Sequence, residues 1–472
     1  MKRIINKFSI TALSVLLLVA SCKKSYLEKA PADALLSDQA LSTVAGLQDA
    51  LKGTYSAMRS ATLFGRDFPV IGDLQADNTF VETKNSGRYL AQYNYSVVSS
   101  DAVASEMWNN AYLAILRANR ILETKLTGAD VDAVKAEAYA IRALMYFKLV
   151  NIYARPYTDN PDGLGVPLVL KYDPFLYPPR NTVKEVYTQI VSDLTAAVPI
   201  APAYTSSVRL SKYSIEGILA KVYLYMGDNT KAKTAALDVI NNGGFQLTTP
   251  ANYEAYWANP AVRTDKLETL FEIDADVINN NGFDDLGGIY INGYQDIYAS
   301  SQLVALYSAT DIRTSVLIAD ATESGANAVL VNKYPNASSP DRDNLKVLRL
   351  SEIYLIAAEA SLPGNEVDAL KYLNALMAKR DPGFVYASTG ATLFNDIIKE
   401  RRKELAFEGD RFYDLNRLKL PVARVANGGA IQAGTGNVNL NVPYSSTKRI
   451  APIPQGEITV NKNIAGQQNP GY

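Results

Sequence analysis

The 472-residue sequence contains no histidine and only one cysteine, Cys22. Without these side chains, a protein cannot build a Ser-His-Asp or Cys-His catalytic site, nor the usual zinc site with nitrogen and sulfur ligands. Composition therefore excludes most hydrolase chemistry. A carboxylate pair, a lysine or tyrosine base, and a metal bound through oxygen ligands remain open.

The sequence also lacks an excess of either charge, with 47 Lys and Arg against 48 Asp and Glu and a formal net charge of -1. A chain with this balance has no electrostatic field that attracts nucleic acid, so we predict no nucleic-acid partner. No apolar stretch after residue 22 approaches the length that spans a membrane. We therefore expect any membrane attachment to depend on a covalently bound lipid.

The N-terminus has the composition of a lipoprotein signal peptide. Basic residues precede an apolar run at 8–20, which is too short to cross a bilayer, and Val-Ala-Ser then leads to Cys22. Small residues before a cysteine are what a lipoprotein signal peptidase accepts after the thiol has been diacylated. We predict a signal peptide at 1–21, lipidation at Cys22 and a tether at 22–36.

The remaining chain, 37–472, is predicted to be one domain rich in helices. When Gly227 is aligned with Gly364, small and apolar residues recur at the same offsets on both sides of a short turn. Such a repeat is typical of tetratricopeptide helix pairs, which stack into an α-solenoid. The predicted fold class is therefore all-α, with a tetratricopeptide-like solenoid.

Two long stretches interrupt the helical periodicity, at 65–100 and 243–344. Long loops within a compact protein often carry its function. We divide the domain into an N-terminal helical half at 37–242, a loop insertion at 243–344, and C-terminal helices with an irregular tail at 345–472.

The stretch 396–418 combines a strong helical pattern with a high density of charge, and Gly409 is the expected end of its helix. Opposite charges recur three and four residues apart, where they can pair along one helix. The charged residues are Glu400, Arg401, Arg402, Glu404, Glu408 and Arg411. We interpret them as structural ion pairs between helices, with catalysis by these carboxylates as the alternative.

The same region carries the sequence Phe-Glu-Gly-Asp-Arg-Phe-Tyr-Asp-Leu-Asn-Arg at 407–417. Together with the segments 142–153 and 350–360 and the terminal segment 452–472, it resembles the SusD-like (RagB/SusD) outer-membrane lipoproteins of Bacteroidetes. The resemblance implies about four helix pairs, no enzymatic activity and capture of oligosaccharide at the cell surface. It also implies delivery to a SusC-like TonB-dependent transporter in the outer membrane.

Candidate ligand-binding residues lie in the two long loops, because sugars need aromatic faces and polar groups that bind pairs of hydroxyls. No binding residue carries over from the family by motif, and the same residue types also build loops. The candidates are Asp77, Asn78, Arg88, Tyr89, Tyr93, Trp257, Tyr290 and Tyr294.

No metal or cofactor site is predicted. Asp274 and Asp276 begin the spacing of a calcium loop, but Ile278 stands where that loop needs Asp or Asn. Two function classes stay open beside glycan binding: a solenoid that binds peptides, and a glycoside hydrolase that uses two carboxylates.

Overall fold

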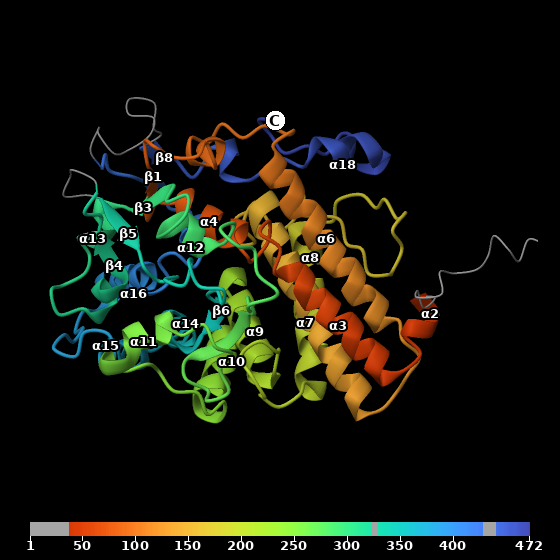
Figure 1. The fold of residues 1–472 in the computed structure, drawn as a ribbon, viewed down its shortest axis with the longest axis horizontal. Coiled ribbons are helices and arrows are strands. Elements are labelled where there is room, and N and C mark those ends of the chain that lie inside the picture. The colour runs from red at the N-terminus through yellow and green to blue at the C-terminus, as the bar shows by residue number, and fades with distance from the viewer. Residues whose placement is uncertain (1–36, 323–327, 428–439) are drawn as a thin grey trace, which may run out of the picture.

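The computed structural model describes residues 37–322, 328–427 and 440–472. The predicted signal peptide, Cys22 and the tether lie outside these residues. Long helices form most of the described part, as predicted (Figure 1). They are α3 (Val44–Met58), α6 (Ala102–Leu122), α7 (Ala129–Tyr153), α8 (Val183–Ala197), α9 (Lys212–Met226), α10 (Asn229–Asn242), α14 (Leu350–Ser361), α15 (Glu366–Met377) and α16 (Gly390–Glu404).

The long helices pack as successive neighbours, so the predicted tetratricopeptide-like solenoid is confirmed. Within the described residues, four pairs follow one another: α3 with α6, α7 with α8, α9 with α10, and α14 with α15. Gly227 ends α9 in the left-handed conformation, with φ 77°, which a residue without Cβ adopts at little cost. The helix pairs around Gly227 and Gly364 are the two copies that the sequence alignment predicts.

The third and fourth pairs are neighbours in space although 243–344 separates them in sequence, because α10 packs against α14. The insertion is less irregular than predicted. It contains the short helices α11 (Tyr253–Ala258), α12 (Leu286–Tyr290) and α13 (Ser301–Val304), and the strands β2 (Thr269–Ile273), β3 (Ile297–Ala299), β4 (Leu317–Ala319) and β5 (Val329–Val331).

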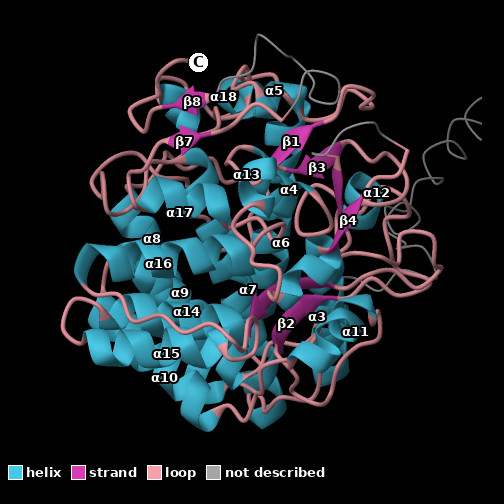
Figure 2. Ribbon diagram, turned by 90° about the vertical axis from the view of Figure 1, so that its left-hand side faces the viewer, coloured by secondary structure: helices cyan, strands magenta, loops and turns pink. Residues whose placement is uncertain are grey.

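In the described parts of the chain, four two-stranded antiparallel sheets connect the segments outside the solenoid. One joins β2 to β6 (Leu345–Arg349), and another joins β3 to β1 (Thr79–Val81). The tail is mostly irregular as predicted, but it carries β8 (Asn441–Val442), which pairs with β7 (Val422–Ala423), and the helix α18 (Gln455–Val460). Figure 2 shows α8, α9, α10, α14, α15 and α16 on the left and β1, β3 and β4 on the right.

The charged stretch forms α16 and α17 (Arg411–Arg417), separated by a turn that contains Gly409. The helix ends at Glu404, so the prediction that it runs to Gly409 is wrong. Gly409 has φ 85°, and a Cβ built on it would lie 2.4 Å from Cα of Pro69 in α4 (Asp67–Leu74). This close backbone contact is the physical reason for a glycine here.

Most charges of α16 pair with other segments, in line with the interpretation as structural ion pairs, because the C-terminal half of the helix is buried and its charges face neighbouring segments. Glu404 Oε1 accepts hydrogen bonds from Arg349 and Arg380, each at 2.9 Å. Its other oxygen accepts from Arg380 and from Arg313. Three guanidiniums therefore surround one carboxylate.

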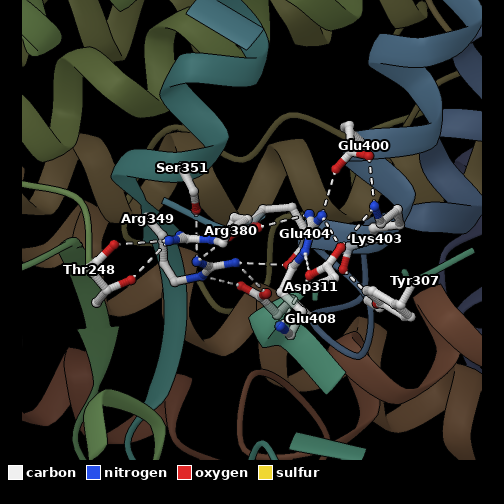
Figure 3. A network of polar contacts seen from close by, with 12 residues as sticks. Thr248, Tyr307, Asp311, Arg349, Ser351, Arg380, Glu400, Lys403, Glu404 and Glu408 are labelled. Atoms are coloured by element: carbon white, nitrogen blue, oxygen red, sulfur yellow. Dashed lines mark hydrogen bonds and ion pairs between the residues drawn. The ribbon is translucent and has the colours of Figure 1, made fainter. Parts of the chain in front are cut away.

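Further ion pairs extend this arrangement into a buried ionic cluster (Figure 3). Every one of its carboxylates contacts at least one of its cations within 3 Å. The cations are Arg313, Lys333, Arg349, Arg380 and Lys403, and the carboxylates are Glu268, Asp311, Glu400, Glu404 and Glu408. Five charges of each sign balance, which offsets the cost of removing them from water.

Candidate functional site

The two loops predicted to hold the ligand site meet in the structure. β1 and β3 pair antiparallel, with Phe80 opposite Tyr298, and this pairing places the segments beyond the strands side by side. Ser86 donates from its backbone N–H and its hydroxyl to the Asp296 carboxylate, at 2.7 and 2.6 Å. We call the surface formed by Arg66, Arg88, Phe283, Asp284 and Tyr294 the loop junction.

Ion pairs fix the charged groups of the loop junction. Arg66 donates to Asp284 at 2.8 Å and to Asp67 at 2.9 Å. Burial alone would lower the pKa of the Arg66 guanidinium, but Tyr89, Asp67 and Asp284 outweigh burial and raise that pKa. Arg66 therefore stays a fixed cation beneath the more exposed Asp284, whose side chain is 48% exposed.

The Arg88 guanidinium lies over the Tyr294 ring, with Cζ 3.6 Å from the ring centre. It also donates to the Ser86 hydroxyl at 2.8 Å and approaches Asp284 at 3.5 Å. A guanidinium over an aromatic ring is attracted by the negative face of the ring, and its N–H donors lie in the plane of the guanidinium. Both side chains are partly exposed, so this stacked pair can present donors and an aromatic edge to a ligand.

Phe283 extends the loop junction as an apolar surface, since it is 49% exposed and carries the Arg342 guanidinium 5.1 Å from its ring centre. Two residues of the loops that form the junction have an unusual backbone conformation. Tyr89 and Gln295 both adopt positive φ, of 59° and 51°, which is uncommon for residues other than glycine. Local strain of this kind often marks binding segments.

Of the eight predicted ligand residues, only Arg88 and Tyr294 offer accessible side chains to the loop junction. The other six are buried, each at most 4% exposed. Because their polar groups and rings are packed within the protein, they have no surface for a ligand in this structure. They are Asp77, Asn78, Tyr89, Tyr93, Trp257 and Tyr290.

Two of the six connect the first loop to the charged C-terminal stretch, and a third, Tyr93, contacts Arg424 beyond that stretch. Asp77 accepts from Arg411 at 2.8 Å, and Asn78 accepts from Arg402 at 2.9 Å. Burial alone would raise the pKa of Asp77, but the guanidiniums of Arg411 and Arg402 hold it below its usual value. Tyr93 lies under the Arg424 guanidinium, 4.5 Å from its ring centre.

The remaining three are packed into the interior. Tyr89 donates its hydroxyl to Asp67 at the base of the loop junction. Trp257 packs beside the ionic cluster, with Lys333 Nζ 4.5 Å from its ring centre. Tyr290 stacks on Tyr334, with ring centres 6.2 Å apart.

Arg66, Phe283 and Asp284 are not among the ligand residues that the sequence predicts. Phe283 and Asp284 lie within the segment 279–285, which is rich in Asn and Asp and contains one glycine, so its composition could have indicated an exposed turn. Arg66 carries no comparable signal. Its role depends on a partner 218 residues away in the sequence.

Glu404, at the centre of the ionic cluster, does not have the properties of a general acid. Burial alone would raise the pKa of Glu404, but Arg380, Arg349 and Arg313 hold it well below its usual value. A glycosidase acid needs the opposite shift, to a raised pKa that keeps its proton. This geometry favours the structural interpretation of the stretch over the catalytic one.

The described residues contain no group of three or more Cys, Asp or Glu side chains placed to hold a metal ion. Within the same residues, no helix combines the length and the apolar composition needed to cross a membrane.

Comparison with known proteins gives concordant matches over most of the chain. Residues 25–224 match a family model described as starch-binding and associating with the outer membrane, and residues 319–472 match the model of the SusD family. SusD-like protein P2 of Formosa agariphila is 29% identical, with 99% of this chain and all of that protein covered. A SusD-like protein of Bacteroides ovatus is 25% identical, with 84% and 80% covered.

Solved structures show the same fold. A SusD superfamily protein of Bacteroides thetaiotaomicron has a TM-score of 0.82 and 29% identity, and covers 91% of this chain and all of its own. A laminarin-binding SusD-like protein has a TM-score of 0.71 and 23% identity, with 91% and 99% covered.

Proposed function

This chain belongs to the SusD family, and from that premise we propose that it is a non-catalytic outer-membrane lipoprotein that binds oligosaccharide at the loop junction. Lipid on Cys22 anchors it, and its single helical domain, 37–472, presents the loop junction at the cell surface. It passes the captured glycan to a SusC-like TonB-dependent transporter.

The observation that carries the binding proposal is the Arg88–Tyr294 pair, 3.6 Å apart, beside an exposed carboxylate. Arg88 supplies paired N–H donors and Asp284 supplies acceptors, which suits adjacent hydroxyls of a sugar. Tyr294 and Phe283 supply apolar ring surface for the C–H groups of a sugar. The similarity to a laminarin-binding SusD-like protein makes laminarin oligosaccharides a reasonable first probe.

The site is polar but close to charge balance, since two arginines face Asp284 and Arg66 also pairs with Asp67. A balanced surface neither attracts nor repels polyanions strongly. We therefore expect neutral oligosaccharides, and not uronic-acid or sulfated chains, to bind best.

Calorimetric titration with a panel of neutral oligosaccharides, laminarin fragments among them, tests the binding proposal. Arg88→Ala and Tyr294→Ala should each weaken binding about tenfold, equivalent to about 1.4 kcal/mol. Tyr472→Ala is a matched control, because Tyr472 also carries a cation over its ring, with Lys448 Nζ 3.7 Å from the ring centre, but lies outside the loop junction. Equal binding by all three variants and the wild type would place the glycan elsewhere.

Lipid anchoring is tested separately. Stable attachment needs more than one acyl chain, and a triacylated cysteine supplies that. Cys22→Ala should release soluble protein or accumulate the unprocessed precursor in cell fractions. Membrane recovery and processing equal to wild type would exclude Cys22 as the anchor.

The transporter partnership is tested by affinity purification of the tagged protein from detergent-solubilised outer membranes. We expect a TonB-dependent barrel to co-purify in a defined ratio. Recovery of the lipoprotein alone under mild detergent, with native glycan binding retained, would contradict the partnership while leaving glycan capture standing.

A further inference from the structure

A cavity with a volume of about 300 Å³ lies between α6, the loop 167–178 and α18, and shares no residue with the loop junction. In Figure 1 this loop projects in yellow beyond α6 and α8, on the opposite side of the molecule from β1 and β3. Its walls are mainly apolar and aromatic. Those lining residues are Trp108, Tyr112, Leu113, Leu116, Leu176 and Tyr177.

The loop is anchored at both ends, so its exposed apolar tip is held in place. Tyr146 and Asn119 donate to the Val169 carbonyl, each at 2.8 Å. At the other end, Asn461 donates to the Pro178 carbonyl at 2.9 Å. The Phe175 N–H donates to the Asp173 carboxylate, which closes a turn at the tip.

Every residue from 170 to 177 is exposed, and five of the eight are large and apolar or aromatic. Phe175 has the highest exposure, 79%. Several large apolar side chains exposed on a loop that is anchored at both ends are typical of a protein interaction site. The five residues are Leu170, Tyr172, Phe175, Leu176 and Tyr177.

The charges of the cavity indicate what occupies it. The residues that line the cavity include two carboxylates, Asp173 and Glu457, and no lysine or arginine. Arg180, near the end of the same loop, lines a different cavity and donates to carbonyl groups of 153, 164, 165 and 467. An incoming cation would therefore meet two carboxylates and aromatic rings, which attract it together.

We propose that this cavity is a docking site for a partner protein that inserts an arginine or lysine side chain. The cation lies against the exposed ring of Tyr177 and pairs with Asp173 and Glu457, while apolar neighbours in the partner cover Phe175 and Leu176. The volume is at the small end of ligand cavities, which suits one side chain better than a chain of sugars. Buried arginines surrounded by apolar contacts are frequent anchors of protein interfaces.

Short peptides test the proposal on the mature protein. The probe is acetyl-Gly-Leu-Arg-Leu-Gly-amide, and its control replaces arginine by citrulline, which has nearly the same shape without charge. Trp108 lines the cavity and is one of only two tryptophans, so its fluorescence reports occupancy, with calorimetry for affinity. We expect the arginine peptide to bind about tenfold more tightly than the citrulline peptide.

Glu457→Gln should remove most of that preference, and Tyr177→Ala should weaken both peptides. Glu106→Gln is the matched control, because Glu106 is an exposed glutamate on α6 that does not line the cavity. Glycan binding at the loop junction should remain unchanged in all three variants. Equal affinity for the two peptides, no binding of either at millimolar concentration, or displacement by an oligosaccharide would overturn the proposal.

Discussion

Replacing Glu404 by glutamine removes one negative charge from the centre of the ionic cluster. In the wild type, Glu404 accepts hydrogen bonds from three guanidiniums and is fully buried. The variant leaves five buried cations facing four carboxylates, and the new amide turns an N–H₂ group toward a guanidinium. Breaking a buried ion pair in this way costs about 3–5 kcal/mol of unfolding free energy.

The entropy of unfolding scales with chain length at about 2 cal/mol/K per residue, so a domain of this size loses about 1 °C of melting temperature per kcal/mol. Glu404→Gln should therefore melt about 3–5 °C below wild type by circular dichroism. Asp49→Asn makes the same carboxylate-to-amide change in an exposed pair, where Lys52 and Asp49 side chains are 69% and 73% exposed. That control should shift melting by less than 1 °C. Equal shifts in melting temperature for Glu404→Gln and Asp49→Asn would contradict the conclusion that the buried ionic cluster stabilises the fold.

Three further predictions concern stability. Burial raises the pKa of Asp73 to about 7, so the stability gained from its bound proton is complete below about pH 4 and is lost as pH rises through 7. In denaturant unfolding between pH 5 and 8, Asp73→Asn should therefore lack the pH-dependent change in unfolding free energy that this proton causes, up to about 3 kcal/mol. A pH dependence equal to that of the wild type would contradict the prediction. Gly409→Ala should lower the unfolding free energy by about 3 kcal/mol or more, because of the positive φ of Gly409 and its contact with Pro69. Gly53→Ala, with open space around it in α3, should instead raise the unfolding free energy by about 1 kcal/mol. Similar melting temperatures for the two variants would contradict this prediction. The buried Tyr290 hydroxyl has no hydrogen-bond partner among the described residues. Tyr290→Phe should therefore leave stability unchanged or raise it by up to about 1 kcal/mol, and it should leave glycan binding unchanged. Loss of binding in this variant would restore Tyr290 as a ligand residue.

The solenoid could be predicted from sequence because its contacts are local. Each helix pair repeats an apolar pattern around a short turn, as at Gly227 and Gly364, and stacking follows from the repeat. The four-helix-pair count also follows the family resemblance. The sequence does not predict which segments pair with the insertion, because β1 and β3 are three residues each and their register depends on a contact across more than 200 residues.

The candidate site could be predicted only as a region. Tyrosine is suited both to exposed sugar contacts and to buried stacking, so Tyr290 and Tyr294 look alike in sequence although only Tyr294 is accessible. Asp77 was selected as a polar loop residue, but it is the buried partner of Arg411. The partners that decide burial lie far along the chain, and composition does not identify them.

The most direct test of the central claim is calorimetric titration of the mature protein with the best-binding neutral oligosaccharide. The Arg88→Ala, Tyr294→Ala double variant should lose binding by more than about tenfold but less than about a hundredfold, because the two side chains are in contact and their losses do not add. Its melting temperature should stay within about 2 °C of wild type, because both side chains are partly exposed. Wild-type affinity in that double variant, with the fold intact, would contradict the assignment of the loop junction as the glycan site.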